Sequence, residues 1–256
     1  MSERKIVSSK EIIVCVSDPR REEEGQKLSR HLDCERVKGF LPERKGLYLF
    51  YGEDGLSLTD GELTVRGDFS SLFRRIRPAN LNGEKLVRAV RFKNEEEPPL
   101  VVDATAGMGE DAFLLAAAGC RVEMFEYNPV IAALVRDAME RAKENPNLSP
   151  IVQRMHLREE DSRKALPNIQ ETPDVIYLDP MFPQRQKSGL IKKKFQMLQQ
   201  LEIPCSNEQE LLEAARAAHP RKITVKRPVK GAFLAGVRPS YSLEGSSIRY
   251  DCIVFC

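Results

Sequence analysis

The sequence lacks the residues that most metal sites and membrane anchors need. It has no tryptophan, only three histidines, and six scattered cysteines without a CxxC pair. Zinc and iron–sulfur sites draw on closely spaced cysteine and histidine ligands, so we expect no metal and reduced, buried thiols. The sequence also has no apolar run of transmembrane length and no clear signal-peptide pattern. We therefore expect a cytoplasmic protein with no membrane partner.

Excess charge of one sign is also missing. The 256 residues carry a formal net charge of only +2. Bulk charge therefore provides no general attraction for nucleic acid, and any such binding must depend on local basic patches. The length suits one large domain, or one domain with a small appendage, and we expect a monomer.

The first part of the chain predicts a small N-terminal α+β unit, residues 1–65. Short β-type runs occur at 12–16, 47–51, 56–58 and 63–66, the later ones separated by glycine turns, and 26–32 could form a short helix. No chemistry can be assigned to this unit from its residues.

Residues 66–99 form a basic connector. Its first 28 residues contain only two acids, Asp68 and Glu84, and residues 83–92 predict an amphipathic helix with Leu86, Ala89 and Val90 as the apolar stripe. The basic residues are interleaved with phenylalanines and are Arg66, Arg74, Arg75, Arg77, Lys85, Arg88, Arg91 and Lys93. This pattern suits a phosphate backbone, and it suits a solvated helix face equally well.

Residues 100–256 alternate strands and helices. Strands are predicted at 100–105, 121–126, 152–157, 174–179 and 222–227, with helices at 110–118, 129–143, 162–166, 189–201 and 207–218. This order indicates an α/β fold with a doubly wound, Rossmann-like parallel sheet. A final hairpin, 240–244 with 249–255, would add an antiparallel edge strand.

Three strand ends carry residues suited to a nucleotide. The first strand, with Asp103, leads into a loop in which Gly107 and Gly109 permit a tight turn and close approach to a ligand. Glu126 could accept both hydroxyls of a ribose, and Asp161-Ser162 could bind an adenine edge. Gly107-x-Gly109-x-x-Ala112 also fits the dinucleotide fingerprint, so the loop alone leaves an NAD enzyme possible.

The fourth strand ends in DVIYLDPMFP, residues 174–183. Pro180 biases Asp179 towards an extended conformation, and backbone carbonyls can point outward beside its carboxylate. Two acceptors and the flat ring of Phe182 suit a planar group with an NH₂, such as a nucleobase. A strand-ending Asp-Pro turn without function is the alternative for this stretch alone.

These four sites in order resemble a class I S-adenosylmethionine-dependent methyltransferase, and Asp179-Pro180-Met181-Phe182 resembles the (D/N)PP(F/Y) motif of amine methyltransferases. VVDATAGMGEDAFLLAAAGCRVEMFEYNPVIAALV and VIYLDPMFPQRQKSGLIKKK look like the family of ribosomal RNA small subunit methyltransferase J. The match covers about residues 100–230. Methionine at the third motif position agrees with that family.

The resemblance implies a function and a set of site residues. The expected reaction is methylation, by S-adenosylmethionine, of the N2 amine of a guanosine near the 3′ end of 16S ribosomal RNA, alone or in the assembling 30S subunit. The catalytic residues would be Asp179, Pro180 and Phe182. The expected cofactor contacts are Asp103, Gly107, Gly109, Glu110, Asp111, Glu126, Tyr127, Asp161, Ser162 and Asp179. Glu110 and Asp161 depart from the family pattern, where we expect Arg and Ser.

Two basic runs follow the fourth and fifth strands. The residues predicted to contact RNA are Arg185, Lys187, Lys192, Lys193, Lys194, Lys226 and Arg227. Both runs fall at one predicted rim, where the RNA backbone should pass. A solvated face is the alternative for either run.

Other functions fit part of the sequence. An amine methyltransferase acting on DNA adenine or protein glutamine would use the same motif. An NAD-dependent oxidoreductase would use the glycine loop but leave the Asp179 motif without a role. A non-catalytic RNA-binding module would need only the basic runs. Calorimetry with S-adenosylhomocysteine against NAD separates the cofactor classes, and methyl transfer separates the rest.

Reversing the charge of Lys192, Lys193 and Lys194 to glutamate should weaken RNA binding and flatten its dependence on salt, because fewer counterions are released. Binding measured over a series of salt concentrations tests this. An unchanged slope would mean that these lysines form only a solvated face.

Overall fold

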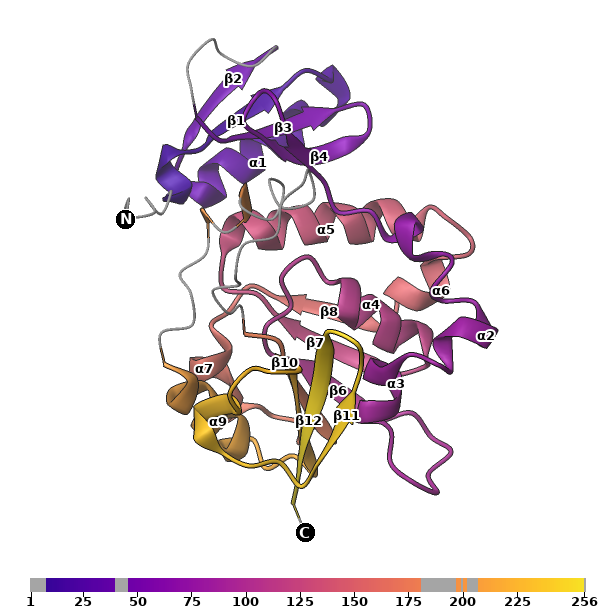
Figure 1. Ribbon diagram of the computed structural model, residues 1–256. Helices are drawn as coiled ribbons and strands as arrows, with labels where there is room; N and C mark the ends of the chain where they lie inside the picture. The colour runs from indigo at the N-terminus through magenta and orange to yellow at the C-terminus, as the bar shows by residue number, and fades with distance from the viewer. Residues whose placement is uncertain (1–7, 40–45, 181–196, 199, 202–206, 256) are drawn as a thin grey trace. The chain divides into compact units, whose positions relative to one another are not determined.

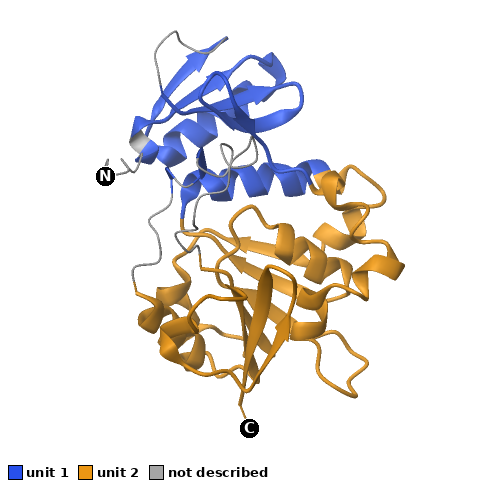
Figure 2. Ribbon diagram, viewed as in Figure 1, with its two compact units in different colours: residues 1–68, 128–141, 183–203 blue, residues 69–127, 142–182, 204–256 orange. Residues whose placement is uncertain are grey.

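The computed structural model describes residues 8–39, 46–180, 197–198, 200–201 and 207–255. The chain folds into two compact units (Figure 2). The first comprises residues 1–68, 128–141 and 183–203, and the second comprises 69–127, 142–182 and 204–256. Residues 128–141 thus group with the N-terminal strands. The boundaries after residues 65 and 99 stay sequence predictions.

The first unit contains a five-stranded sheet in the order β2-β1-β3-β4-β5. β1 is parallel to both β2 and β3, and β3, β4 and β5 form antiparallel pairs. Its elements are η1 (Ser9–Glu11), β1 (Ile13–Val16), η2 (Pro19–Arg21), α1 (Glu22–Leu32), β2 (Glu35–Lys38), β3 (Tyr48–Gly52), β4 (Gly55–Thr59) and β5 (Thr64–Val65).

Helix α1 packs closely on β1. A Cβ at Gly25 would lie 2.3 Å from Cγ2 of Val16, so only glycine permits this approach. The helix begins at Glu22, earlier than predicted, because Glu22, Glu23 and Glu24 suit the positive end of a helix dipole. Strand β2 escaped prediction because its sequence, ERVK, is mostly charged.

Helix α5 (Pro129–Lys143) has the predicted bounds. Asn128 caps it, since its Oδ1 accepts hydrogen bonds from the backbone N–H groups of Val130 at 3.0 Å and Ile131 at 3.3 Å. In the described part of the chain, no helix is long and apolar enough to cross a membrane.

The second unit contains a seven-stranded sheet (Figure 1). Its strands are β6 (Leu100–Asp103), β7 (Arg121–Phe125), β8 (Met155–Arg158), β9 (Val175–Leu178), β10 (Lys222–Pro228), β11 (Tyr241–Glu244) and β12 (Ile248–Val254). Its helical elements are η3 (Phe69–Leu72), α2 (Pro78–Leu81), α3 (Lys85–Val90), α4 (Glu110–Ala117), α6 (Ser149–Val152), α7 (Ser162–Ala165), η4 (Leu166–Asn168), α9 (Glu208–Ala217) and η5 (Leu234–Gly236).

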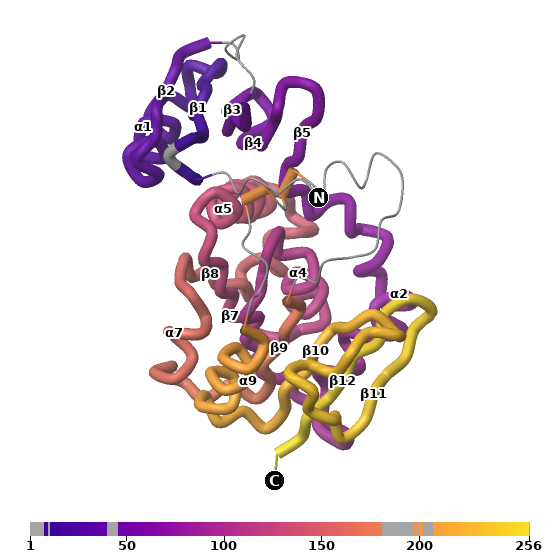
Figure 3. Tube along the Cα trace, turned by 60° about the vertical axis from the view of Figure 1, so that its left-hand side comes forward, coloured from indigo at the N-terminus to yellow at the C-terminus, as the bar shows by residue number. Residues whose placement is uncertain are grey.

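The strand order is β11-β12-β10-β9-β6-β7-β8, so the chain leaves β6 first to one side and then, from β9 on, to the other (Figure 3). β6 to β10 are parallel, and β12 is antiparallel to both of its neighbours. This confirms the doubly wound, Rossmann-like sheet. The predicted C-terminal hairpin is also confirmed: it lies at one end of the sheet, where β12 pairs antiparallel with β10 and β11 forms the edge.

Strand alternation separates the two faces of this sheet. On one face, Val102, Ile176 and Val225 join a core with Leu211 and Leu212 of α9. The opposite face meets α3. There Lys222, only 2% exposed, donates hydrogen bonds to the carbonyls of Ala89 at 2.9 Å and Arg91 at 2.8 Å at the helix end. A cation at a helix C-terminus is favourable, which accounts for a fully buried lysine.

Two predicted segments differ from the structure. The strand predicted at 152–157 lies at 155–158, because residues 149–152 form the short helix α6 with proline in its first turn. The helix predicted at 189–201 lies almost wholly outside the described residues.

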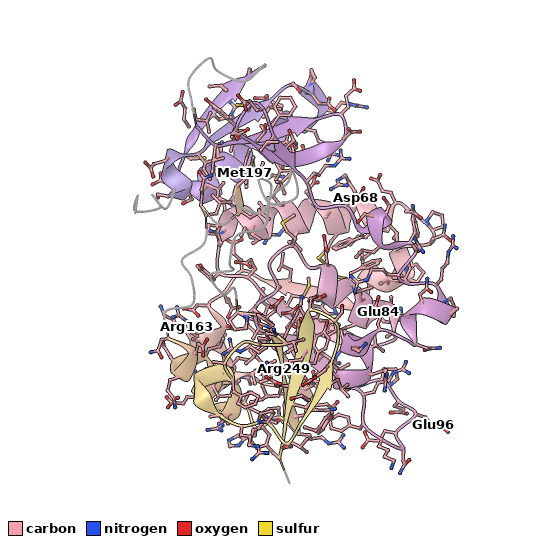
Figure 4. All side chains as sticks on the ribbon, viewed as in Figure 1. Asp68, Glu84, Glu96, Arg163, Met197 and Arg249 are labelled. Atoms are coloured by element: carbon pink, nitrogen blue, oxygen red, sulfur yellow. The ribbon has the colours of Figure 1, made fainter. Side chains whose placement is uncertain are left out.

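Arg249 of β12 holds the loop that follows β10 (Figure 4). Its guanidinium pairs with Asp251 at 2.8 Å and donates hydrogen bonds to the carbonyls of Pro228, Val229 and Gly231 at 2.6–3.0 Å. Both charged side chains are 5% exposed. The chain from β10 onward is therefore fixed by a buried, multiply bonded cation.

Arg249→Ala should lower the free energy of unfolding by about 3–5 kcal/mol, because Asp251 would stay buried without its partner. Urea-induced unfolding followed by circular dichroism measures this. Lys27→Ala is the control, since the Glu23–Lys27 pair is about three-quarters exposed and its loss should change little. Equal effects of the two substitutions would contradict the structural role of Arg249.

Candidate active site at the carboxyl edge of the seven-stranded sheet

The parallel strands β6, β7, β8, β9 and β10 all end at one edge of the sheet. Such edges bind ligands in open α/β folds, at the point where the strand order reverses. Here that point lies between β6 and β9. The loops after these strands carry most of the residues that the sequence predicts for the site.

The loop between β6 and α4 approaches the end of β7. Gly107 and Gly109 have φ values of +52° and +74°, which favour glycine. Glu126 is 4% exposed, and its Oε2 accepts a hydrogen bond from the backbone N–H of Gly107 at 3.0 Å. A Cβ at Gly107 would meet no atom within 4 Å among the described residues. The loop thus leaves room for a ligand beside the Glu126 carboxylate.

Asp161 and Ser162 begin helix α7. The Asp161 carboxylate caps the helix through the backbone N–H of Arg163 at 3.0 Å and pairs with the Arg163 guanidinium at 2.7 Å. These hydrogen bonds lower the pKa of Asp161. Asp161 therefore has a structural role, while Ser162 is 7% exposed. Glu110 and Tyr127 lie on the surface, and Tyr127 is 45% exposed.

A carboxylate–lysine cluster, which consists of Asp111, Asp179 and Lys226, lies beside this loop. Nζ of Lys226 is 2.7 Å from Oδ2 of Asp111 and 2.8 Å from Oδ2 of Asp179. The hydroxyl of Tyr177 donates a hydrogen bond to the same Asp111 oxygen at 2.6 Å. The backbone N–H of Asp179 donates to Oγ1 of Thr105 at 2.6 Å. The end of β9 is thereby tied to the first loop and to β10.

Burial controls the charges in this region. It raises the pKa of Asp103, 1% exposed, to about 8, so that this carboxyl holds a proton at neutral pH. Burial also raises the pKa of Asp179, and Lys226 opposes that rise. For Lys226 itself, burial favours the neutral amine, but the charges of Asp111 and Asp179 outweigh it and raise the pKa above its usual value.

Lys226 and Arg227 point to opposite faces of the sheet because they are neighbours on one strand. Arg227 is 3% exposed and binds the Glu208 carboxylate of α9 at 3.1 Å. The expectation that both side chains share one rim is therefore wrong. Arg227 secures α9, and Lys226 belongs to the carboxylate–lysine cluster.

Several predicted residues lie outside the described residues: Phe182, Arg185, Lys187, Lys192, Lys193 and Lys194. Their RNA and catalytic roles stay predictions. Sequence reasoning overlooked Thr105 and Tyr177. Tyr177 carries the one hydroxyl in the β9 strand VIYL, a signal that could have found it.

Comparisons with known proteins agree with this geometry. Residues 34–255 match a family of SAM-dependent methyltransferases. Ribosomal RNA small subunit methyltransferase J of Thioalkalivibrio sulfidiphilus is 42% identical over 216 residues, 81% of this chain and 84% of the relative. The protein of that name from Pseudomonas aeruginosa is 41% identical over 239 residues, 86% of this chain and 90% of the relative.

The chain belongs to the ribosomal RNA small subunit methyltransferase J family. A crystal structure of a SAM-dependent methyltransferase from Neisseria gonorrhoeae has the same fold, with a TM-score of 0.75 and 32% identity, and covers 94% of this chain and 95% of that one. The family resemblance, the class I fold and the S-adenosylmethionine cofactor are thereby confirmed. The room at Gly107 and the buried Glu126 carboxylate fit that cofactor.

Glu126→Ala should weaken S-adenosylhomocysteine binding by about 10- to 100-fold, the effect of losing a hydrogen bond to a charged group. Isothermal titration calorimetry gives the affinity. Glu123→Ala is a matched control on β7, three residues before Glu126, because Glu123 instead pairs with Arg158 at 3.2 Å. Unaltered affinity in the Glu126 variant, with its fold intact, would remove Glu126 from the cofactor site.

Proposed function

We propose that this protein transfers a methyl group from S-adenosylmethionine to the exocyclic N2 amine of a guanosine near the 3′ end of 16S ribosomal RNA. Membership of the family supports ribosomal RNA of the small subunit as the substrate. The observation that carries the amine chemistry is the position of Asp179, directly after β9 and beside the cofactor loop. We place the reaction in the cytoplasm, where small subunits assemble.

The target amine is a poor nucleophile because its lone pair is delocalised into the purine. Asp179 and the Pro180 carbonyl would accept its two N–H bonds and direct the lone pair at the methyl group. Phe182 would stack on the base. Most of the acceleration then comes from holding the reactants close and aligned rather than from strong acid–base catalysis.

The anchor of Asp179 suits this task. Its backbone N–H is bound by Thr105 and its carboxylate by Lys226, so both ends of the residue are fixed. The Asp179 side chain is 35% exposed, so a substrate can reach it. Thr105 lies in the same loop as Gly107, so the amine acceptor and the proposed cofactor loop are held in register.

S-adenosylmethionine, when bound, supplies an electrophilic methyl group on a sulfonium. Glu126 would hold its ribose, Ser162 its adenine edge, and the Gly107 loop would lie against it. Transfer would form the N–CH₃ bond, break the S–CH₃ bond and release one proton from the amine. The Asp179 carboxylate, which would accept that N–H, would receive the proton.

Asp179→Ala should lower the rate of methyl transfer by about 100-fold or more. The affinity for S-adenosylhomocysteine should fall only modestly. Asp179→Asn is the matched variant: it keeps one acceptor oxygen, as in the (D/N)PP(F/Y) motif, and should retain part of the activity. Transfer of a labelled methyl group measures both. Equal activity of Asp179→Ala and the parent would refute the assignment.

The substrate is decided by transfer of a labelled methyl group to under-methylated small-subunit RNA, assembled particles, DNA and protein in parallel. We expect transfer to RNA or particles, with the label recovered as N2-methylguanosine. Transfer to DNA adenine or protein glutamine alone would refute the RNA substrate. RNA binding without any transfer would leave only a binding module.

A further inference from the structure

Lys226 is more buried than a lysine that binds an RNA phosphate needs to be. It lies on β10 opposite the end of β9, and only 24% of its side chain is exposed. Two of its three N–H donors point to carboxylates, at 2.7 Å and 2.8 Å. Because both contacts neutralise the ammonium, Lys226 is poorly suited to bind a phosphate of the nucleic-acid backbone.

We propose that Lys226 is a positioning residue that fixes the Asp179 carboxylate by its Oδ2 atom, so that Oδ1 meets the target amine. This proposal rests on the proposed function and deepens it. Asp111 holds Lys226 from the other side, and Tyr177 holds Asp111. A chain of contacts thus runs from the first turn of α4, through β10, to the amine acceptor.

The charges around Asp179 explain why the lysine is needed. Asp111 faces it as a second carboxylate, and buried Asp103 lies close by on β6. Tyr177 of β9 and Tyr250 of β12 add no charge near pH 7, because a phenol is neutral there and burial raises the pKa of both further. Arg75, a second cation near Asp111, is bound by Glu84 at 2.8 Å. Among the residues that the structure describes, Lys226 is thus the cation that contacts both Asp111 and Asp179.

The consequence can be measured as a function of pH. Asp179 accepts an N–H more strongly as the carboxylate than as the neutral acid, so the rate falls as pH decreases through its pKa. Burial and Asp111 raise that pKa, and Lys226 lowers it. Loss of the lysine should therefore move the acid limb of the pH–rate profile to higher pH, by about one unit or more for a cation in direct contact.

The experiment compares Lys226→Met, Lys226→Arg and the control Lys230→Met in the full-length protein, with saturating cofactor and RNA. We expect Lys226→Met to lower kcat and to move the acid limb upward, while the RNA dissociation constant changes less than twofold. Lys226→Arg should restore much of both. Lys230 is exposed after β10, and its loss should leave the acid limb in place.

A second variant guards against misfolding, because Lys226→Met leaves two carboxylates facing each other. Asp111→Asn with Lys226→Met removes one charge of each sign. Its acid limb should lie between those of the parent and Lys226→Met, since the effect of Lys226 on Asp179 exceeds that of Asp111. Thermal unfolding of each variant shows which ones remain folded.

A titration of Asp179 by carboxyl-carbon NMR, assigned with Asp179→Asn, gives the same pKa without any substrate. An unmoved Asp179 pKa in the folded double variant would overturn the proposal. So would an unmoved acid limb in Lys226→Met together with weaker RNA binding and a flatter salt dependence. A parent that transfers no methyl group to RNA refutes the proposed function instead, and the NMR titration still decides the role of Lys226.

Discussion

Asp111 from the first turn of a helix and Asp179 from the end of a central strand share the ammonium of Lys226, with both contacts below 3 Å. Lys226 opposes the rise that burial causes in the pKa of Asp179. The arrangement keeps the end of β9, the start of α4 and strand β10 in fixed relation. The loop after β6 joins the same set, because the backbone N–H of Asp179 donates a hydrogen bond to Oγ1 of Thr105.

The order of the strands brings these segments together. β9 lies between β6 and β10, so the residue after β9 has the glycine loop on one side and Lys226 on the other. In the sequence VKRP, residues 225–228, successive side chains point to opposite faces of the sheet. Lys226 turns to the carboxylates, and Arg227 turns to Glu208 and secures α9 on the opposite face. One strand therefore contributes both to the carboxylate–lysine cluster and to the packing of α9.

Charge is handled differently at Glu126 and Asp161, two further residues predicted to contact the cofactor. Glu126 is buried, and its carboxylate accepts a hydrogen bond from the Gly107 backbone N–H, beside open space that a side chain at Gly107 would enter. The Asp161 carboxylate caps α7 by accepting a hydrogen bond from the backbone N–H of Arg163, and it also pairs with the Arg163 guanidinium. The departure of Asp161 from the serine expected in the family thus has a local reason, because aspartate both caps α7 and binds the neighbouring guanidinium.

Alternating periodicity and turn residues are local signals, and they were enough to predict the α/β fold, most strand and helix positions in residues 100–256, the glycine loop and the Asp179 motif. The resemblance to a known family identified the methyl donor. Three features became visible only in the folded chain: the face that each residue of β10 occupies, the position of β12 inside the sheet, and the contact of Lys226 with two aspartates. Those contacts join residues 47 to 115 positions apart, and a local pattern carries no information about which distant strands become neighbours.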